Sequence, residues 1–145
     1  MKSKLLAQTG AERTFILVLD EGEEALATIT AFAKQERIGA ASLSAIGAFT
    51  RGVVGWFDFA ARGYRDIPVE EQCEVLSLIG DIAVGDDGAP SLHAHIVLGL
   101  KDGSTRGGHL LEGVTHPSLE VVLVETPIHL RRRKHPALGI ALIEF

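Results

Sequence analysis

The hydrophobic positions in the first third of the chain predict a strand followed by a helix. Residues 13–20 (RTFILVLD) are rich in β-branched and aromatic side chains, which is typical of a strand. In residues 23–37 the apolar side chains recur at the spacing of one helix face: Ala25, Ile29, Phe32 and Ala33. Acidic residues open this segment and basic residues close it, as the helix dipole favours. Gly39 follows as the expected helix stop.

Beyond this helix the pattern changes to that of β-structure. Turn signals occur at Thr50-Arg51-Gly52, in the GDDG sequence of residues 85–88 and at Asp102-Gly103. Seven segments are strand-like: residues 41–49, 53–59, 74–84, 92–100, 106–114, 119–125 and 138–145. One helix beside so many closely spaced strands predicts an α+β fold with a largely antiparallel sheet. We expect a single domain, residues 1–145.

The composition leaves the predicted fold unchanged, but it excludes several classes of function. Apolar residues make up 46% of the chain and the mean hydropathy of +0.22 is high for 15.5 kDa, so we expect partner subunits to cover apolar surface. The net charge of −5 disfavours an indiscriminate nucleic-acid binder. The single cysteine, Cys73, excludes an internal disulfide and fits a reducing compartment. Because the sequence shows neither a signal-peptide core nor a bilayer-length apolar run, we expect a cytoplasmic protein without a membrane partner.

Three of the six histidines fall in one apparent hairpin, residues 90–114. Alternation along a strand puts His93 and His95 on one face and a core pattern on the other, namely Leu92, Ala94, Ile96 and Leu98. The face of His109 depends on the register. A loop of three or five residues places His109 on the face of His95, and a two-residue turn places it on the opposite face. A bulge at Gly107-Gly108 could reverse that outcome.

The histidines have two interpretations. Three neutral imidazoles on one face suit Zn²⁺, and three protein ligands leave a fourth coordination position for water or a ligand. Alternatively, His93 and His95 are solvent-facing strand residues and His109 serves packing only. A third histidine across the hairpin, preceded by two glycines, favours the metal site.

Two further features are weaker candidates. Glu74 shares a predicted strand face with Leu76 and Leu78, so it is a partner of a metal-bound histidine, a general acid or base, or a carboxylate at the wet end of the strand. The basic run RRRKH, residues 131–135, could hold a phosphate or an acidic ligand. Pro136 and the acidic balance of the chain favour a solvated loop between the last two strands.

Four segments, in order along the chain, carry a family resemblance: residues 19–49, EVLSLIGDIAV, LHAHIVLGLKDGSTRGGHLLEGV and LEVVLVE. With them the chain resembles the PPC-domain family, found alone in bacteria and archaea and fused to AT-hooks in plants. The resemblance implies an α+β fold, a homotrimer, and metal binding at His93, His95 and His109. The family fold is also similar to that of acetolactate decarboxylase, an enzyme with a three-histidine zinc site. This chain lacks the Arg-Gly-Arg-Pro core of an AT-hook.

Together these observations predict a homotrimer that binds a divalent metal, zinc, through His93, His95 and His109. The open coordination position would serve a small oxo- or hydroxy-acid ligand or substrate, as the decarboxylase resemblance suggests. The sequence leaves open whether the site is catalytic, and Glu74 is the best carboxylate candidate. The alternative is a DNA-associated regulator in which the domain mediates oligomerisation and partner docking. Without an AT-hook, we expect the isolated chain not to bind DNA tightly.

Overall fold

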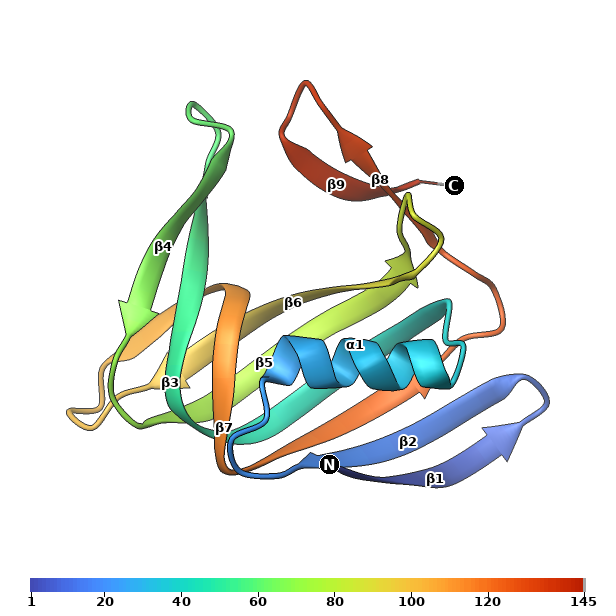
Figure 1. Cartoon of the computed structure of the whole chain (residues 1–145), viewed down its shortest axis with the longest axis horizontal. Coiled ribbons are helices and arrows are strands. Elements are labelled where there is room, and N and C mark those ends of the chain that lie inside the picture. The colour runs from blue at the N-terminus through green and yellow to red at the C-terminus, as the bar shows by residue number, and fades with distance from the viewer. Residues whose placement is uncertain (145) are drawn as a thin grey trace.

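The computed structural model describes residues 1–144, which form one helix and nine strands (Figure 1). In chain order the elements are β1 (Lys2–Thr9), β2 (Glu12–Leu19), α1 (Ala25–Gln35), β3 (Ala40–Asp58), β4 (Gly63–Val69), β5 (Cys73–Val84), β6 (Pro90–Gly99), β7 (Thr105–Glu125), β8 (Arg131–His135) and β9 (Ile140–Glu144). All nine strands belong to one sheet, and every strand pair is antiparallel except a single contact between β5 and β8. The prediction of a single α+β domain with a largely antiparallel sheet is confirmed.

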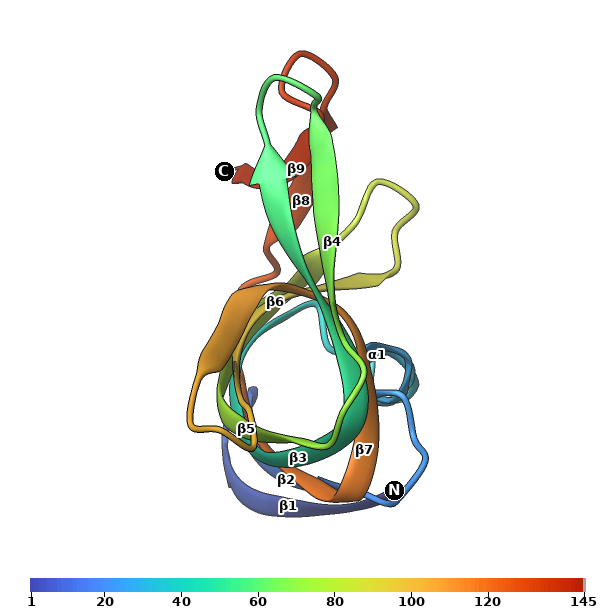
Figure 2. The same ribbon diagram turned by 90° about the vertical axis from the view of Figure 1, so that its left-hand side faces the viewer.

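Four strands close into a ring around the core. β3 pairs with β5, β5 with β6, β6 with β7, and β7 again with β3. Figure 2 shows this ring end-on, and the β1–β2 hairpin continues the sheet beyond β7. Side chains from these strands and from α1 bury one another in a single cluster, which includes Leu17, Phe49, Leu78, Ile96 and Leu123.

The helix lies close to its predicted bounds. The Glu24 carboxylate caps its N-terminus by accepting hydrogen bonds from the backbone N–H groups of Leu26 and Ala27. The predicted apolar face is the buried one, and it packs against β6 and β7. The helix ends before the predicted stop at Gly39, because Arg37 already takes the left-handed conformation with φ of 58°. No helix of the described residues is long and apolar enough to cross a membrane.

The two longest strands each merge segments that the pattern separated. β3 covers two predicted strands and the turn predicted at Thr50-Arg51-Gly52, so that turn is wrong, and β7 likewise covers two predicted strands. Both strands bend where their register shifts, between Gly47 and Phe49 and between Phe49 and Arg51. A Cβ atom at Gly47 would lie 2.3 Å from the carbonyl oxygen of Ser118, so the close approach requires glycine. The residues at such a bend resemble those of a turn, which is why the sequence pattern predicted one.

Three strands form where no strand was predicted. β1 and β4 are exposed along most of their length and therefore lack the alternation that marks a half-buried strand. β8 is the basic run, so its prediction as a solvated loop is wrong: it pairs with β9 in an antiparallel hairpin. β9 covers most of the predicted segment 138–145, whose last residue, Phe145, lies outside the described residues.

Two hairpins project from the same end of the ring, as Figures 1 and 2 show. One is formed by the outer half of β3 with β4, and the other by β8 with β9. The β8–β9 hairpin pairs with the rest of the sheet through one residue pair, Val84 with Arg131. Residues of both hairpins line one pocket together with histidines of β6 and β7.

Candidate metal centre

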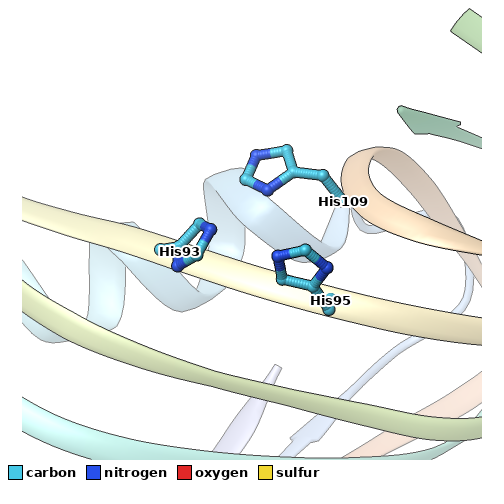
Figure 3. A group of neighbouring side chains, drawn as sticks. All are labelled: His93, His95 and His109. Atoms are coloured by element: carbon cyan, nitrogen blue, oxygen red, sulfur yellow. The ribbon is translucent and has the colours of Figure 1, made fainter. Parts of the chain in front are cut away.

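The fold brings His93, His95 and His109 together. His93 and His95 lie on β6, and His109 lies on β7 directly opposite His95. One ring nitrogen of each histidine lies within 4.8 Å of the others, and Figure 3 shows the three rings gathered on one side of the strands. Nitrogens bound to one Zn²⁺ at roughly 2.0–2.1 Å lie about 3.3 Å apart, so small ring rotations would complete the arrangement.

The register of the hairpin is one of the alternatives that the sequence left open. Gly99 pairs with Thr105, which leaves residues 100–104, a loop of five, between β6 and β7. This loop length puts His109 on the face of His95, and the β6–β7 pairing contains no bulge. Gly108, directly before His109, is required by close packing and not by a bulge. A Cβ atom at Gly108 would lie 2.5 Å from the carbonyl oxygen of Gly55, so the glycine allows β3 and β7 to approach.

The other face of β6 belongs to the core, as predicted. Ala94, Ile96 and Leu98 are at most 2% exposed, whereas His95 is exposed and His93 is half-buried. The histidines therefore stand on the outer surface of the ring, where they can contact a ligand without disturbing the core.

His109 is the most enclosed of the three and is held as a neutral ring. Its imidazole stacks on Tyr64, with ring centroids 4.6 Å apart. Burial, with the nearby charges of His93, His95 and Arg132, lowers the pKa of His109 to about 4. Its buried Nδ1 has no hydrogen-bond partner among residues 1–144. A neutral imidazole with an unpaired buried nitrogen is what a metal ligand requires, so the residues present fit a zinc ion.

Asp81 and Arg132 complete the site, and sequence reasoning missed both of these roles. Asp81 lies on β5 directly opposite His93, with its Oδ2 3.7 Å from His93 Nδ1. The Arg132 guanidinium donates from Nη2 to Asp81 Oδ1. Burial would raise the pKa of Asp81, but His93 and Arg132 outweigh it and hold the pKa below its ordinary value. A carboxylate beside a metal-binding histidine orients the ring, and the available signal was the one charge between Val75 and Val84.

Glu74 is not brought to the histidines. It is exposed and pairs with Gly99, whereas Asp81 and His93 lie toward the opposite end of β5 and β6. A register shift between Val75 and Ser77 also divides the face on which it was placed, so Leu76 is 53% exposed while Leu78 is buried. This position matches the interpretation of Glu74 as a carboxylate at the wet end of the strand.

The three histidines form one wall of a pocket of about 450 Å³. The β3–β4 hairpin contributes an aromatic wall of Phe57, Phe59 and Tyr64, in which neighbouring rings meet edge-on. The β8–β9 hairpin contributes Arg132 and residues 139–142. The pocket is within the size range of small-molecule sites and combines apolar walls with a few polar groups at one end.

Comparison with known proteins identifies the family. The sequence model of the Plants and Prokaryotes Conserved (PCC) domain, the family also abbreviated PPC, matches residues 6–127. The chain belongs to this family. Three solved structures resemble it along nearly their whole length. The PPC protein of Pyrococcus horikoshii is 35% identical, with a TM-score of 0.86 and coverage of 96% of this chain and 98% of that chain. A protein of Archaeoglobus fulgidus named as metal-containing is 29% identical, with a TM-score of 0.84 and coverage of 100% and 99%.

The third, a protein of Bacteroides thetaiotaomicron named provisionally as DNA-binding, is 27% identical, with a TM-score of 0.85 and coverage of 96% and 95%. A curated relative, the bifunctional protein GlmU of a Synechococcus strain, is 29% identical over 134 residues, but this chain spans only 20% of its length. A Staphylococcus aureus protein similar to α-acetolactate decarboxylase is 14% identical, with a TM-score of 0.57 over 81% of this chain and 54% of that chain. That likeness concerns the fold alone, and it confirms the predicted similarity of fold.

Proposed function

We propose that this PPC-domain protein binds one divalent metal ion, zinc, through His93, His95 and His109. The observation that carries the proposal is the convergence of three imidazole nitrogens within 4.8 Å, and His109 also has a buried Nδ1 without a hydrogen-bond partner among residues 1–144. The low pKa of His109 supports it, because a metal ion need not displace a proton from that ring at neutral pH. The metal-containing relative from Archaeoglobus fulgidus also supports it.

Three protein ligands would leave one coordination position of the metal for a ligand in the pocket that the histidines line. A metal bound there would polarise a carbonyl or carboxylate, or lower the pKa of a bound water. The protein's own contribution is to hold the rings: Asp81 orients His93, and Tyr64 fixes the plane of His109. We propose a small oxo- or hydroxy-acid as ligand or substrate.

Metal analysis of the purified, untagged protein tests the proposal. We expect close to one zinc ion per chain after dialysis against trace zinc, measured by inductively coupled plasma mass spectrometry. His95→Ala and His109→Ala should each lose most of the metal, because two imidazoles make an incomplete set of ligands. His116→Ala and His129→Ala are matched controls, since both histidines lie outside the cluster, and they should keep full metal content. A wild-type protein that stays metal-free under these conditions would contradict the proposal.

We also propose that the chain assembles as a homotrimer. A row of directly paired residues crosses the outer face of the sheet from Ile16 through Val122, Ser44 and Ile79 to His95. Ile79 is 60% exposed, and Ile46, Leu76 and Val124 add further exposed apolar area on this part of the sheet. A contiguous apolar face of this kind is typical of a subunit interface. Light scattering should give about three times the 15.5 kDa chain mass, and a stable monomer at micromolar concentration would contradict the trimer.

A DNA-associated role is the second candidate, because one relative is named provisionally as DNA-binding and three basic side chains on β8 are exposed: Arg131, Arg133 and Lys134. The net charge of −5 and the missing AT-hook weigh against direct binding by the isolated chain. A titration with AT-rich duplex at rising salt concentration tests it. Submicromolar affinity at physiological salt that is lost in an Arg131→Gln, Arg133→Gln double variant would favour this second function.

A further inference from the structure

Arg132 differs from every other residue of the basic run. Its side chain is 7% exposed, whereas Arg131, Arg133 and Lys134 are exposed. One guanidinium nitrogen, Nη2, donates to Asp81, and a second, Nη1, is buried without a hydrogen-bond partner among residues 1–144. A buried charged donor without an acceptor is costly, so its retention beside a pocket points to an acceptor that arrives with a ligand.

The surroundings of Arg132 define what that ligand needs. The same pocket is lined by Arg132 and by all three histidines, so one small molecule can reach both. Asp81 already balances the charge of Arg132, and no other carboxylate of the described residues lines this pocket. A divalent metal would therefore leave the polar end of the pocket positively charged, which favours an anion.

The rest of the pocket is apolar. Phe57, Phe59 and Tyr64 face it from one hairpin, and Ile140 and Leu142 face it from the other. Phe59 is 71% exposed and meets the Phe57 ring edge-on, so this aromatic wall is accessible to a ligand. An anion without an apolar body would leave these side chains in contact with water.

We propose that Arg132 is the anion receptor of this pocket, and that the ligand is an organic acid with an apolar body. Its carboxylate binds the Arg132 guanidinium, a neighbouring hydroxyl or carbonyl oxygen reaches the metal position, and its apolar body lies against Phe57, Phe59 and Tyr64. The metal contact rests on the proposed function, but the role of Arg132 does not. Because Nη1 is covered, contact requires a small movement of β8, which is joined to β5 by one strand pair, Val84 with Arg131, and by the Arg132–Asp81 ion pair.

The competing explanation is purely structural. The Arg132–Asp81 ion pair joins β8 to β5, so Arg132 could serve only to hold the β8–β9 hairpin in place. In that case Arg132 would affect stability and would not distinguish an acid from an uncharged molecule of the same shape.

Titration calorimetry with a matched pair of probes separates the two explanations. The probes are 3-phenyllactate and 3-phenyllactamide, which differ only in that the carboxylate is replaced by a neutral amide. Zinc-loaded wild-type protein should bind the acid at least about tenfold more tightly than the amide, since a hydrogen bond to a charged group is among the strong ones. Glycolate, which has the same polar end but no phenyl group, should also bind at least about tenfold more weakly.

Variants of Arg132 test whether this preference for the acid depends on its guanidinium. In Arg132→Gln the acid and the amide should bind alike, while Arg132→Lys should keep part of the preference because it keeps the charge. Arg133→Gln is the matched control: Arg133 is an exposed neighbour on the same strand, paired with Glu144, and its loss should leave the preference unchanged. If Arg132→Gln does not fold, chelator-treated, metal-free wild-type protein is titrated with both probes: a preference for the acid that remains without zinc supports Arg132 as the receptor, and its absence overturns the proposal.

Three other results of these titrations would decide the role of Arg132. Equal binding of acid and amide by zinc-loaded wild-type protein, or binding of neither, would overturn the proposal for Arg132 and leave the metal site standing. A preference for the acid that survives in Arg132→Gln would overturn it as well. A wild-type protein that holds no zinc but keeps an Arg132-dependent preference would contradict the proposed metal function and support Arg132 as the receptor.

Discussion

His95 and Ile96 are neighbours on β6, but they belong to different parts of the molecule. Ile96 is 2% exposed and packs in the core with Ala94 and Leu98, whereas His95 stands on the outer face beside His93. The inner face is specified by its own alternation, because each apolar residue gains by burial wherever the strand pairs. The outer face becomes a candidate metal site only because of the residues on the neighbouring strands: His109 on β7 and Asp81 on β5. One strand therefore carries a face for stability and a face for chemistry.

The largest expected effect divides the two faces directly. Ile96→Ala should lower the free energy of unfolding by about 2–5 kcal/mol, because it leaves a cavity in the core. His95→Ala should change the stability of the metal-free protein by less than about 1 kcal/mol, yet remove most of the bound zinc. Chemical denaturation of chelator-treated protein and metal analysis measure the two effects. If His95→Ala destabilised the metal-free protein as much as Ile96→Ala, the distinction between the faces would be lost.

An intermediate effect concerns the support of the outer face. Asp81→Asn should weaken zinc binding by about 10- to 100-fold, because the carboxylate beside His93 orients the ring and strengthens it as a ligand. Competition with a chromogenic chelator gives the affinity. Asp66→Asn, an exposed change on β4, should leave it unchanged. An unaltered affinity in Asp81→Asn would show that His93 needs no such partner.

The last expected effect concerns the pH dependence of stability. In the metal-free protein, His109 has a pKa of about 4 when folded, below the roughly 6.5 of an unfolded chain. Protonation therefore favours the unfolded state, so this contribution to stability is present above about pH 6.5 and is lost as the pH falls toward 4. Denaturation curves at pH 7 and pH 4.5 should show a smaller loss in His109→Gln than in the wild type. His129→Gln, outside the cluster, should lose as much as the wild type.

Several parts of the site and fold were predictable from local pattern. The five-residue loop between β6 and β7 is one of the lengths that the sequence left open, whereas the buried face of α1 and the core face of β6 match what the residues predicted. Spacing was sufficient in these cases, because helix and strand periodicity depends on neighbours within a few positions. The turn predicted inside β3 and the loop predicted for β8 were wrong, because bends and exposed strands do not show that periodicity.

The sequence by itself determined the α+β class, the core residues of β6 and the identity of the three histidines. Only the tertiary structure decided that Asp81 and Arg132, 51 positions apart in the chain, form an ion pair beside them, and that two hairpins enclose a pocket above them. Apolar side chains that are buried recur at regular spacing along a helix or strand, so this periodicity can be read from a short stretch of sequence. A contact between β5 and β8 depends on how the whole sheet curls, so no short stretch of the chain records it.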